Sequence, residues 1–81
     1  MDEAALRLIV RRNLAAGELP HDLRRVRGCA EGGEECDACG ELTMRYQTVI
    51  EGISPTDKRG VRLHVECLYV WDMERDAPGR T

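Results

Sequence analysis

The chain of 81 residues has no phenylalanine, one tryptophan and two tyrosines. Aromatic side chains bury the largest areas in protein cores, so a chain of this length with so few of them can build only a small core. Small domains of this kind commonly gain stability from disulfides or from a bound metal. The length and composition therefore predict a single small domain that needs a source of stability in addition to apolar packing.

Long apolar runs are also missing. No stretch approaches the roughly 20 apolar residues that a membrane-spanning helix needs, so we expect no membrane insertion. The opening residues Met-Asp-Glu-Ala-Ala lack the basic start and apolar run of a secretory signal. We therefore expect a cytoplasmic protein, in which cysteines rarely form disulfides and more often bind metal.

Two short pairs of metal-ligand residues are the main chemical signal. Two residues separate Cys36 from Cys39, and two separate His64 from Cys67. Each pair can bind Zn²⁺ from one turn of the chain, and two pairs complete a tetrahedron. The four are the predicted ligands of one structural zinc ion, with disulfides or an iron site as alternatives. Chelation is then expected to unfold the second half of the chain, which holds all four ligands.

A site with four protein ligands has no coordination position for water or substrate, so the pattern argues against an enzyme and predicts no catalytic residue. His64-Val65-Glu66 and Cys36-x-x-Cys39 do contain the parts of a nucleotide deaminase signature. Their order is reversed and the chain is short, so Glu66 is better interpreted as an acidic residue in the first turn of a helix.

Cys29 leaves two questions open. It lies in the glycine-rich segment 27–33, where it could replace His64 as a fourth ligand. It could also act as a redox-sensitive thiol that displaces the metal through a disulfide. The spacing favours the two pairs, because Cys29 has no partner two residues away, and the simpler interpretation is a bystander thiol.

Periodicity predicts a small α+β domain stabilised by zinc. We expect a helix over 2–16, a short helical turn over 21–26, a glycine and acid loop over 28–35, a metal-binding knuckle over 36–41, a strand over 44–51, a loop over 52–60, a strand over 61–65 and a helix from 66. As domain organisation, this gives an N-terminal helical arm (1–27), a connecting loop (28–35), a CCHC zinc finger (36–77) and a tail (78–81).

A knuckle, a β-hairpin and a helix whose first turn delivers the last ligand resemble a treble-clef finger. With Trp71 after the second pair, residues 36–75 resemble the zinc fingers of poly(ADP-ribose) polymerases and, less closely, LIM domains. The chain is also similar to small bacterial proteins in which a helical arm containing Leu-Pro precedes such a finger. The first resemblance implies DNA recognition and the second implies protein binding.

Charge does not separate these functions sharply. The formal net charge is −3, and acidic residues surround the first cysteine pair, which departs from the polymerase-type pattern. We therefore favour a small regulatory adaptor that binds a protein or a second copy, with no small-molecule substrate. Its expected contact surface is the stripe Leu6, Val10 and Leu14, with Tyr69 or Trp71, although the stripe could instead pack on the finger. The alternative is a DNA- or RNA-binding factor that uses Arg24, Arg25, Arg27, Lys58, Arg59 and Arg62.

Overall fold

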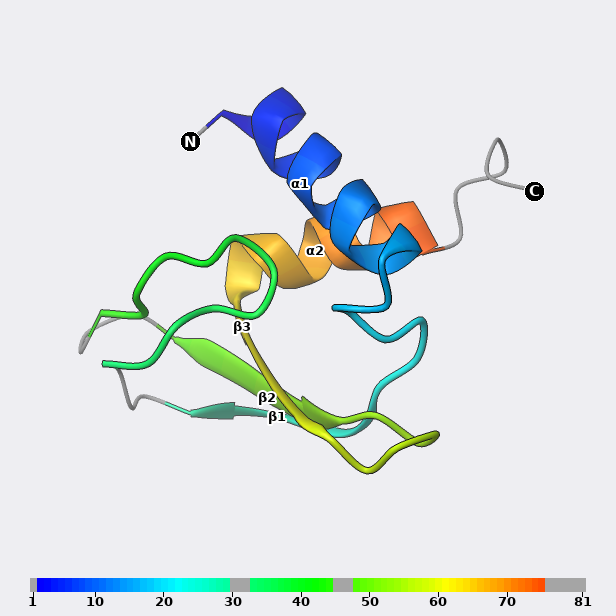
Figure 1. The fold of residues 1–81 in the computed structure, drawn as a ribbon. Helices are drawn as coiled ribbons and strands as arrows, with labels where there is room; N and C mark the ends of the chain where they lie inside the picture. The colour runs from blue at the N-terminus through cyan, green and yellow to red at the C-terminus, as the bar shows by residue number, and fades with distance from the viewer. Residues whose placement is uncertain (1, 30–32, 45–47, 76–81) are drawn as a thin grey trace.

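The computed structural model describes residues 2–29, 33–44 and 48–75, without the side chains of Arg25 and Cys29. The elements follow in the order α1 (Glu3–Ala15), β1 (Arg24–Cys29), β2 (Val49–Ile53), β3 (Gly60–His64) and α2 (Val65–Arg75). The strands form one antiparallel sheet in the order β1-β2-β3. Figure 1 shows α1 packed on α2, with α2 lying between α1 and the sheet. The predicted α+β class is confirmed, and no helix of the described ranges is long and apolar enough to cross a membrane.

Helix α1 begins and ends where the sequence predicts, to within a residue. The Asp2 carboxylate accepts a hydrogen bond of 2.7 Å from the backbone N–H of Ala5, which satisfies one of the free donors at the helix start. Gly17 follows the helix with a φ of +80°, a left-handed conformation that costs glycine little.

The segment after α1 corrects one prediction. Residues 21–26 do not form a helical turn, because Arg24–Cys29 is strand β1, which pairs with β2. Gly28 and Cys29, predicted to begin the loop, lie opposite Ile50 and Val49 in this pairing. β1 is an edge strand, and its described side chains are exposed. Its sequence, Arg-Arg-Val-Arg, therefore shows no alternation of apolar and polar residues, and its strand structure depends on pairing with the neighbouring strand.

The predicted hairpin is confirmed, with shifted bounds. β2 begins at Val49, so the described residues Met44 and Thr48 lie outside it, and 45–47 fall outside the described residues. Gly52, Ile53 and Gly60 belong to paired strands, which shortens the predicted loop to 54–59. β3 then passes into α2 without an intervening residue, since His64 ends the strand and Val65 begins the helix.

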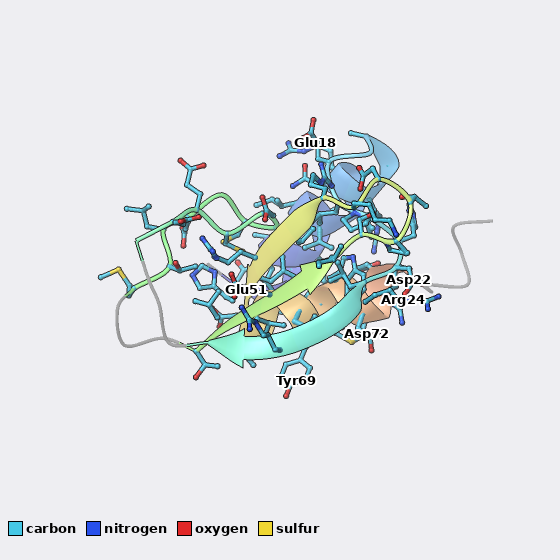
Figure 2. The ribbon with its side chains drawn as sticks, turned by 90° about the horizontal axis from the view of Figure 1, so that it is seen from below. Glu18, Asp22, Arg24, Glu51, Tyr69 and Asp72 are labelled. Carbon is cyan, nitrogen blue, oxygen red and sulfur yellow. The ribbon has the colours of Figure 1, made fainter. Side chains whose placement is uncertain are left out.

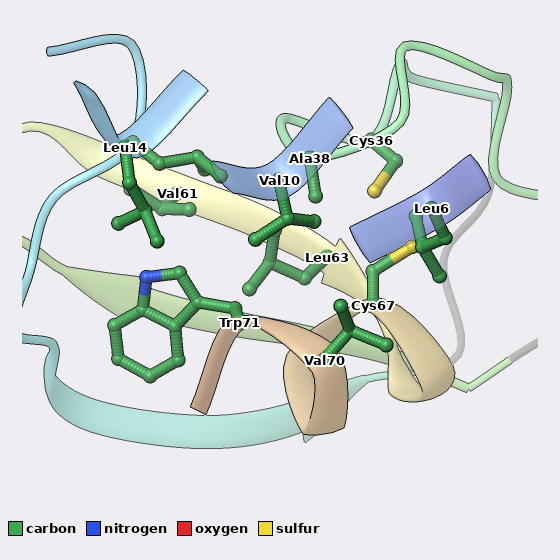
Figure 3. Close-up of a cluster of buried hydrophobic side chains, with 11 residues drawn as sticks. Leu6, Val10, Leu14, Cys36, Ala38, Val61, Leu63, Cys67, Val70 and Trp71 are labelled. Atoms are coloured by element: carbon green, nitrogen blue, oxygen red, sulfur yellow. The ribbon is translucent and has the colours of Figure 1, made fainter. Parts of the chain in front are cut away.

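The core joins the first and second parts of the chain. A single cluster of buried side chains combines residues from α1, β3, α2 and the loops before and after β1: Leu6, Val10, Leu14, Leu19, Cys36, Ala38, Val61, Leu63, Cys67, Val70 and Trp71 (Figure 3). The α1 stripe is therefore core and not the contact surface predicted for it. Trp71 is also buried, at 4% exposure, and its indole N–H donates to the carbonyl oxygen of Pro20 at 2.7 Å.

Candidate metal centre

The two ligand pairs meet in space. One ligand atom from each of Cys36, Cys39, His64 and Cys67 lies within 4.8 Å of the other three. The Nδ1 atom of His64 is 3.5 Å from the sulfur of Cys39 and 3.7 Å from that of Cys67. A tetrahedral zinc ion with ordinary bond lengths separates nitrogen and sulfur ligands by about 3.6 Å. The cluster thus fits one metal ion, and sulfur with imidazole is a donor set that zinc favours.

A tight turn presents the first pair. The backbone N–H of Cys36 donates to Glu41 at 2.8 Å, and that of Gly40 donates to the carbonyl of Cys36 at 2.9 Å. Gly40 follows the second cysteine with a φ of +79°, a left-handed conformation that costs glycine little. The turn therefore folds back on itself and places both cysteine side chains on one side.

Asp37, between the two cysteines, attaches this turn to β3. Its backbone N–H donates to the Arg62 carbonyl at 2.8 Å, and its carboxylate accepts from the Arg62 backbone N–H at 2.7 Å. The side chain of Asn13 on α1 adds a third attachment by donating to the carbonyl of Ala38 at 3.0 Å. These contacts hold the first cysteine pair beside His64, and ligand spacing in the sequence gives no signal for them.

The second pair uses the strand-to-helix junction. His64 is the last residue of β3 and Cys67 lies in the first turn of α2. The Nε2 atom of His64 is 3.3 Å from the carbonyl oxygen of Leu42, which can only accept a hydrogen bond. Nε2 therefore carries the proton and Nδ1 keeps its lone pair for a metal. Such an outer hydrogen bond fixes the tautomer and the ring orientation of a metal-binding histidine.

The thiols share their protons unequally. The pKa of Cys36 is lowered to about 4, chiefly because the thiol of Cys67 donates a hydrogen bond to its thiolate, with backbone amides adding to the effect. The same hydrogen bond, together with burial, raises the pKa of Cys67. Burial raises the pKa of Cys39, and the Cys36 thiolate adds repulsion. Three thiolates at this distance need a divalent cation to offset their mutual repulsion.

The cluster is continuous with the core. Cys36 and Cys67 are each 1% exposed and belong to the buried apolar cluster, while Cys39 is half-buried. Figure 3 shows both buried sulfurs at the end of the core near Leu6, away from Trp71. The side chain of Cys29 lies outside the described residues, so its predicted alternatives as ligand or redox thiol stay predictions.

The residues predicted to bind nucleic acid are spread over the sheet and its turns. Arg24 pairs with Asp22 at 3.4 Å, and these two lie at the end of the sheet away from Glu51 (Figure 2). Arg27 and Arg62 meet at Glu51, at 3.7 Å and 2.8 Å, and Arg62 also contacts Glu34.

Two further predicted cations lie in the β2–β3 turn. Arg59 donates to the carbonyl of Glu18 at 2.8 Å, and Lys58 is exposed with a φ of +63°. The side chain of Arg25 is outside the described part of the chain. Three of the predicted arginines thus form ion pairs with carboxylates of the chain itself.

No family model, curated protein or solved structure matches this chain. The resemblance to polymerase-type and LIM-type fingers therefore stays a prediction from ligand spacing.

Proposed function

We propose that the chain is a non-catalytic zinc module with one structural Zn²⁺ bound by Cys36, Cys39, His64 and Cys67. The approach of their ligand atoms to within 4.8 Å is the observation that carries this proposal. The knuckle, the β2–β3 hairpin and α2 then correspond to the three parts of a treble-clef-like finger. Four protein ligands fill a tetrahedral shell, so the ion supports the fold and offers no position to a substrate.

We further propose that the module acts as a small adaptor that binds a protein. Two features support this choice over nucleic acid. Ion pairs with Asp22 and Glu51 occupy Arg24, Arg27 and Arg62, which lowers the positive potential available to phosphates. Several large apolar side chains, in contrast, are exposed: Leu8, Val26, Leu42, Met44, Tyr69 and Met73.

Metal analysis tests the zinc module. The purified full chain is expected to contain one zinc ion per molecule by mass spectrometry of the metal. The Cys67→Ser variant is expected to lose most of the bound zinc. The control variant Thr56→Ser, at an exposed position outside the cluster, is expected to keep an unchanged zinc content. Metal content well below stoichiometry in the unmodified chain would refute the proposal.

Salt dependence separates protein from nucleic-acid binding. A gel-shift titration at two salt concentrations uses duplex, nicked and single-stranded probes. We expect no retained complex even at low salt. A complex that weakens steeply with salt would instead establish the nucleic-acid alternative, because phosphate contacts release counterions.

A further inference from the structure

A groove opens beside the proposed metal centre. Its volume is about 550 Å³, and it lies between the start of α1, the segment 39–44 and one face of α2. The metal ligands Cys39, His64 and Cys67 form part of its wall. Cavities of roughly 300–1,000 Å³ are typical of sites that bind a small ligand or a few side chains of a partner.

The groove collects most of the large hydrophobic side chains that are exposed among the described residues. Leu42, Met44, Tyr69 and Met73 line it, and they are four of the six large hydrophobic side chains that are exposed. Tyr69 is 65% exposed and projects from α2 at the margin of the molecule in Figure 2. An apolar surface concentrated at one concave site is typical of protein recognition.

The charged side chains that line the groove are carboxylates. Glu3, Glu41 and Glu66 line it, and His64 is the only basic residue type among the described lining residues. Arg7 approaches the margin, where its guanidinium lies 3.4 Å from Glu3 and 3.5 Å from the sulfur of Met73, so it offsets one carboxylate. A zinc ion with three thiolates would add a further formal charge of about −1.

The face of α2 in the groove joins both properties. Glu66, Tyr69, Val70 and Met73 line the groove and follow helical spacing, so they are neighbours on one side of α2. A lysine or arginine placed over the Tyr69 ring would gain a cation–π contact and would lie near the Glu66 carboxylate. Apolar side chains of the same ligand could enter between Leu42 and Met73.

From these observations, and resting on the adaptor function proposed above, we infer that the groove binds a short peptide segment of a partner protein that carries bulky apolar side chains flanked by lysine or arginine. The acidic, apolar lining selects this chemistry over acidic or wholly apolar peptides. A second copy of the chain is a poorer fit, because a stable protein interface buries about 800 Å² per partner and the groove holds only a few side chains.

Selection from a random peptide library displayed on phage tests this inference with the zinc-loaded full chain as bait. Enriched peptides are expected to combine apolar residues with lysine or arginine. The most enriched peptide is then synthesised with a fluorescent label, and its affinity is measured by anisotropy. Tyr69→Lys is expected to weaken binding by about tenfold or more, as loss of a central aromatic contact does. The control Leu8→Lys, at an equally exposed position outside the groove, is expected to leave affinity within about twofold.

The double variant Glu41→Gln with Glu66→Gln tests the charge. It is expected to weaken binding and to flatten its salt dependence, whereas Glu18→Gln, outside the groove, does neither. Zinc content and circular dichroism are measured for every variant, so that loss of fold is distinguished from loss of contact. Unchanged binding in a folded Tyr69→Lys variant would refute the site.

Other outcomes overturn the inference in distinguishable ways. Enrichment of acidic peptides would refute the partner chemistry and leave the adaptor function standing. A dimer in sedimentation that Tyr69→Lys dissociates would show that a second copy fills the groove. Absence of any enriched peptide, with zinc bound and the fold intact, would refute the peptide-binding groove and leave the adaptor function standing, because a library of short peptides contains no folded partner surface.

Discussion

Removal of the metal is expected to unfold the entire chain, beyond the second half that holds the ligands. The core cluster joins α1 to Cys36 and Cys67, so no separate apolar core remains for α1 when the ligands separate. A helix of 13 residues is marginal in water on its own.

The magnitudes favour complete unfolding. A chain of 81 residues has an expected unfolding free energy of about 4–12 kcal/mol at the usual value per residue. Zinc binding by finger peptides contributes about 10–16 kcal/mol. Because the contribution of the metal is comparable to or larger than the expected stability of the whole chain, the metal-free chain is expected to be mostly unfolded near neutral pH.

Circular dichroism and tryptophan fluorescence measure this together. A strong chelator is added to the zinc-loaded chain, and excess zinc is then added back as the control. If only α2 unfolds, roughly half of the helical signal persists, since α1 and α2 have 13 and 11 residues. We expect nearly all of it to disappear and the emission of Trp71, at the opposite end of the core from the ligands, to shift to the red (Figure 3). Helical signal and Trp71 emission that both survive chelation would refute the reasoning.

Substitutions at three further positions test the ligand assignment and the packing of the fold. Asp37→Ala removes the acceptor for the Arg62 backbone N–H and is expected to lower zinc affinity about tenfold in competition with a chromogenic chelator, while Asp37→Asn keeps an acceptor and most of the affinity. Cys29→Ser is expected to leave zinc stoichiometry unchanged, and loss of metal in this variant would contradict the ligand assignment. Glu74→Ala removes a side chain that is only 4% exposed and lies 2.9 Å from Arg11, so the unfolding free energy in urea is expected to fall by about 1–2 kcal/mol; an unchanged midpoint would contradict a stabilising role.

The sequence predicts those parts of the fold that local patterns determine. Helix α1 has an N-cap, an apolar stripe and a terminating glycine, and the alternation of Val61 and Leu63 identifies β3. Strand β1 is not predicted, because its sequence shows no alternation of apolar residues and its structure depends on pairing with β2. The shared core also depends on contacts between residues distant in sequence. The sequence therefore could not decide whether the apolar stripe of α1 is exposed as a contact surface or packed in the core.

The candidate metal site, too, is only partly predictable from the sequence. Spacing alone predicts the four residues that the structure brings together in one cluster, because pairs separated by two residues are typical of zinc sites. Ligand spacing does not predict the groups that position these residues. The Leu42 carbonyl, the Asp37 carboxylate and the Asn13 amide form hydrogen bonds with residues 22 to 25 positions away in the sequence. The sequence does not predict the groove either, because the exposed apolar residues of segments 42–44 and 69–73 come together only in the folded chain.

The direct passage from β3 into α2 makes this stretch intolerant of length changes. One extra residue between His64 and Val65 would turn Cys67 by about 100° around the helix axis relative to the imidazole. The thiol would then face away from its three companions, and the apolar side of α2 would rotate out of the interior with it. Insertions in this protein should therefore be tolerated in the exposed part of the β2–β3 turn, residues 56–58, and rejected at the strand-to-helix boundary.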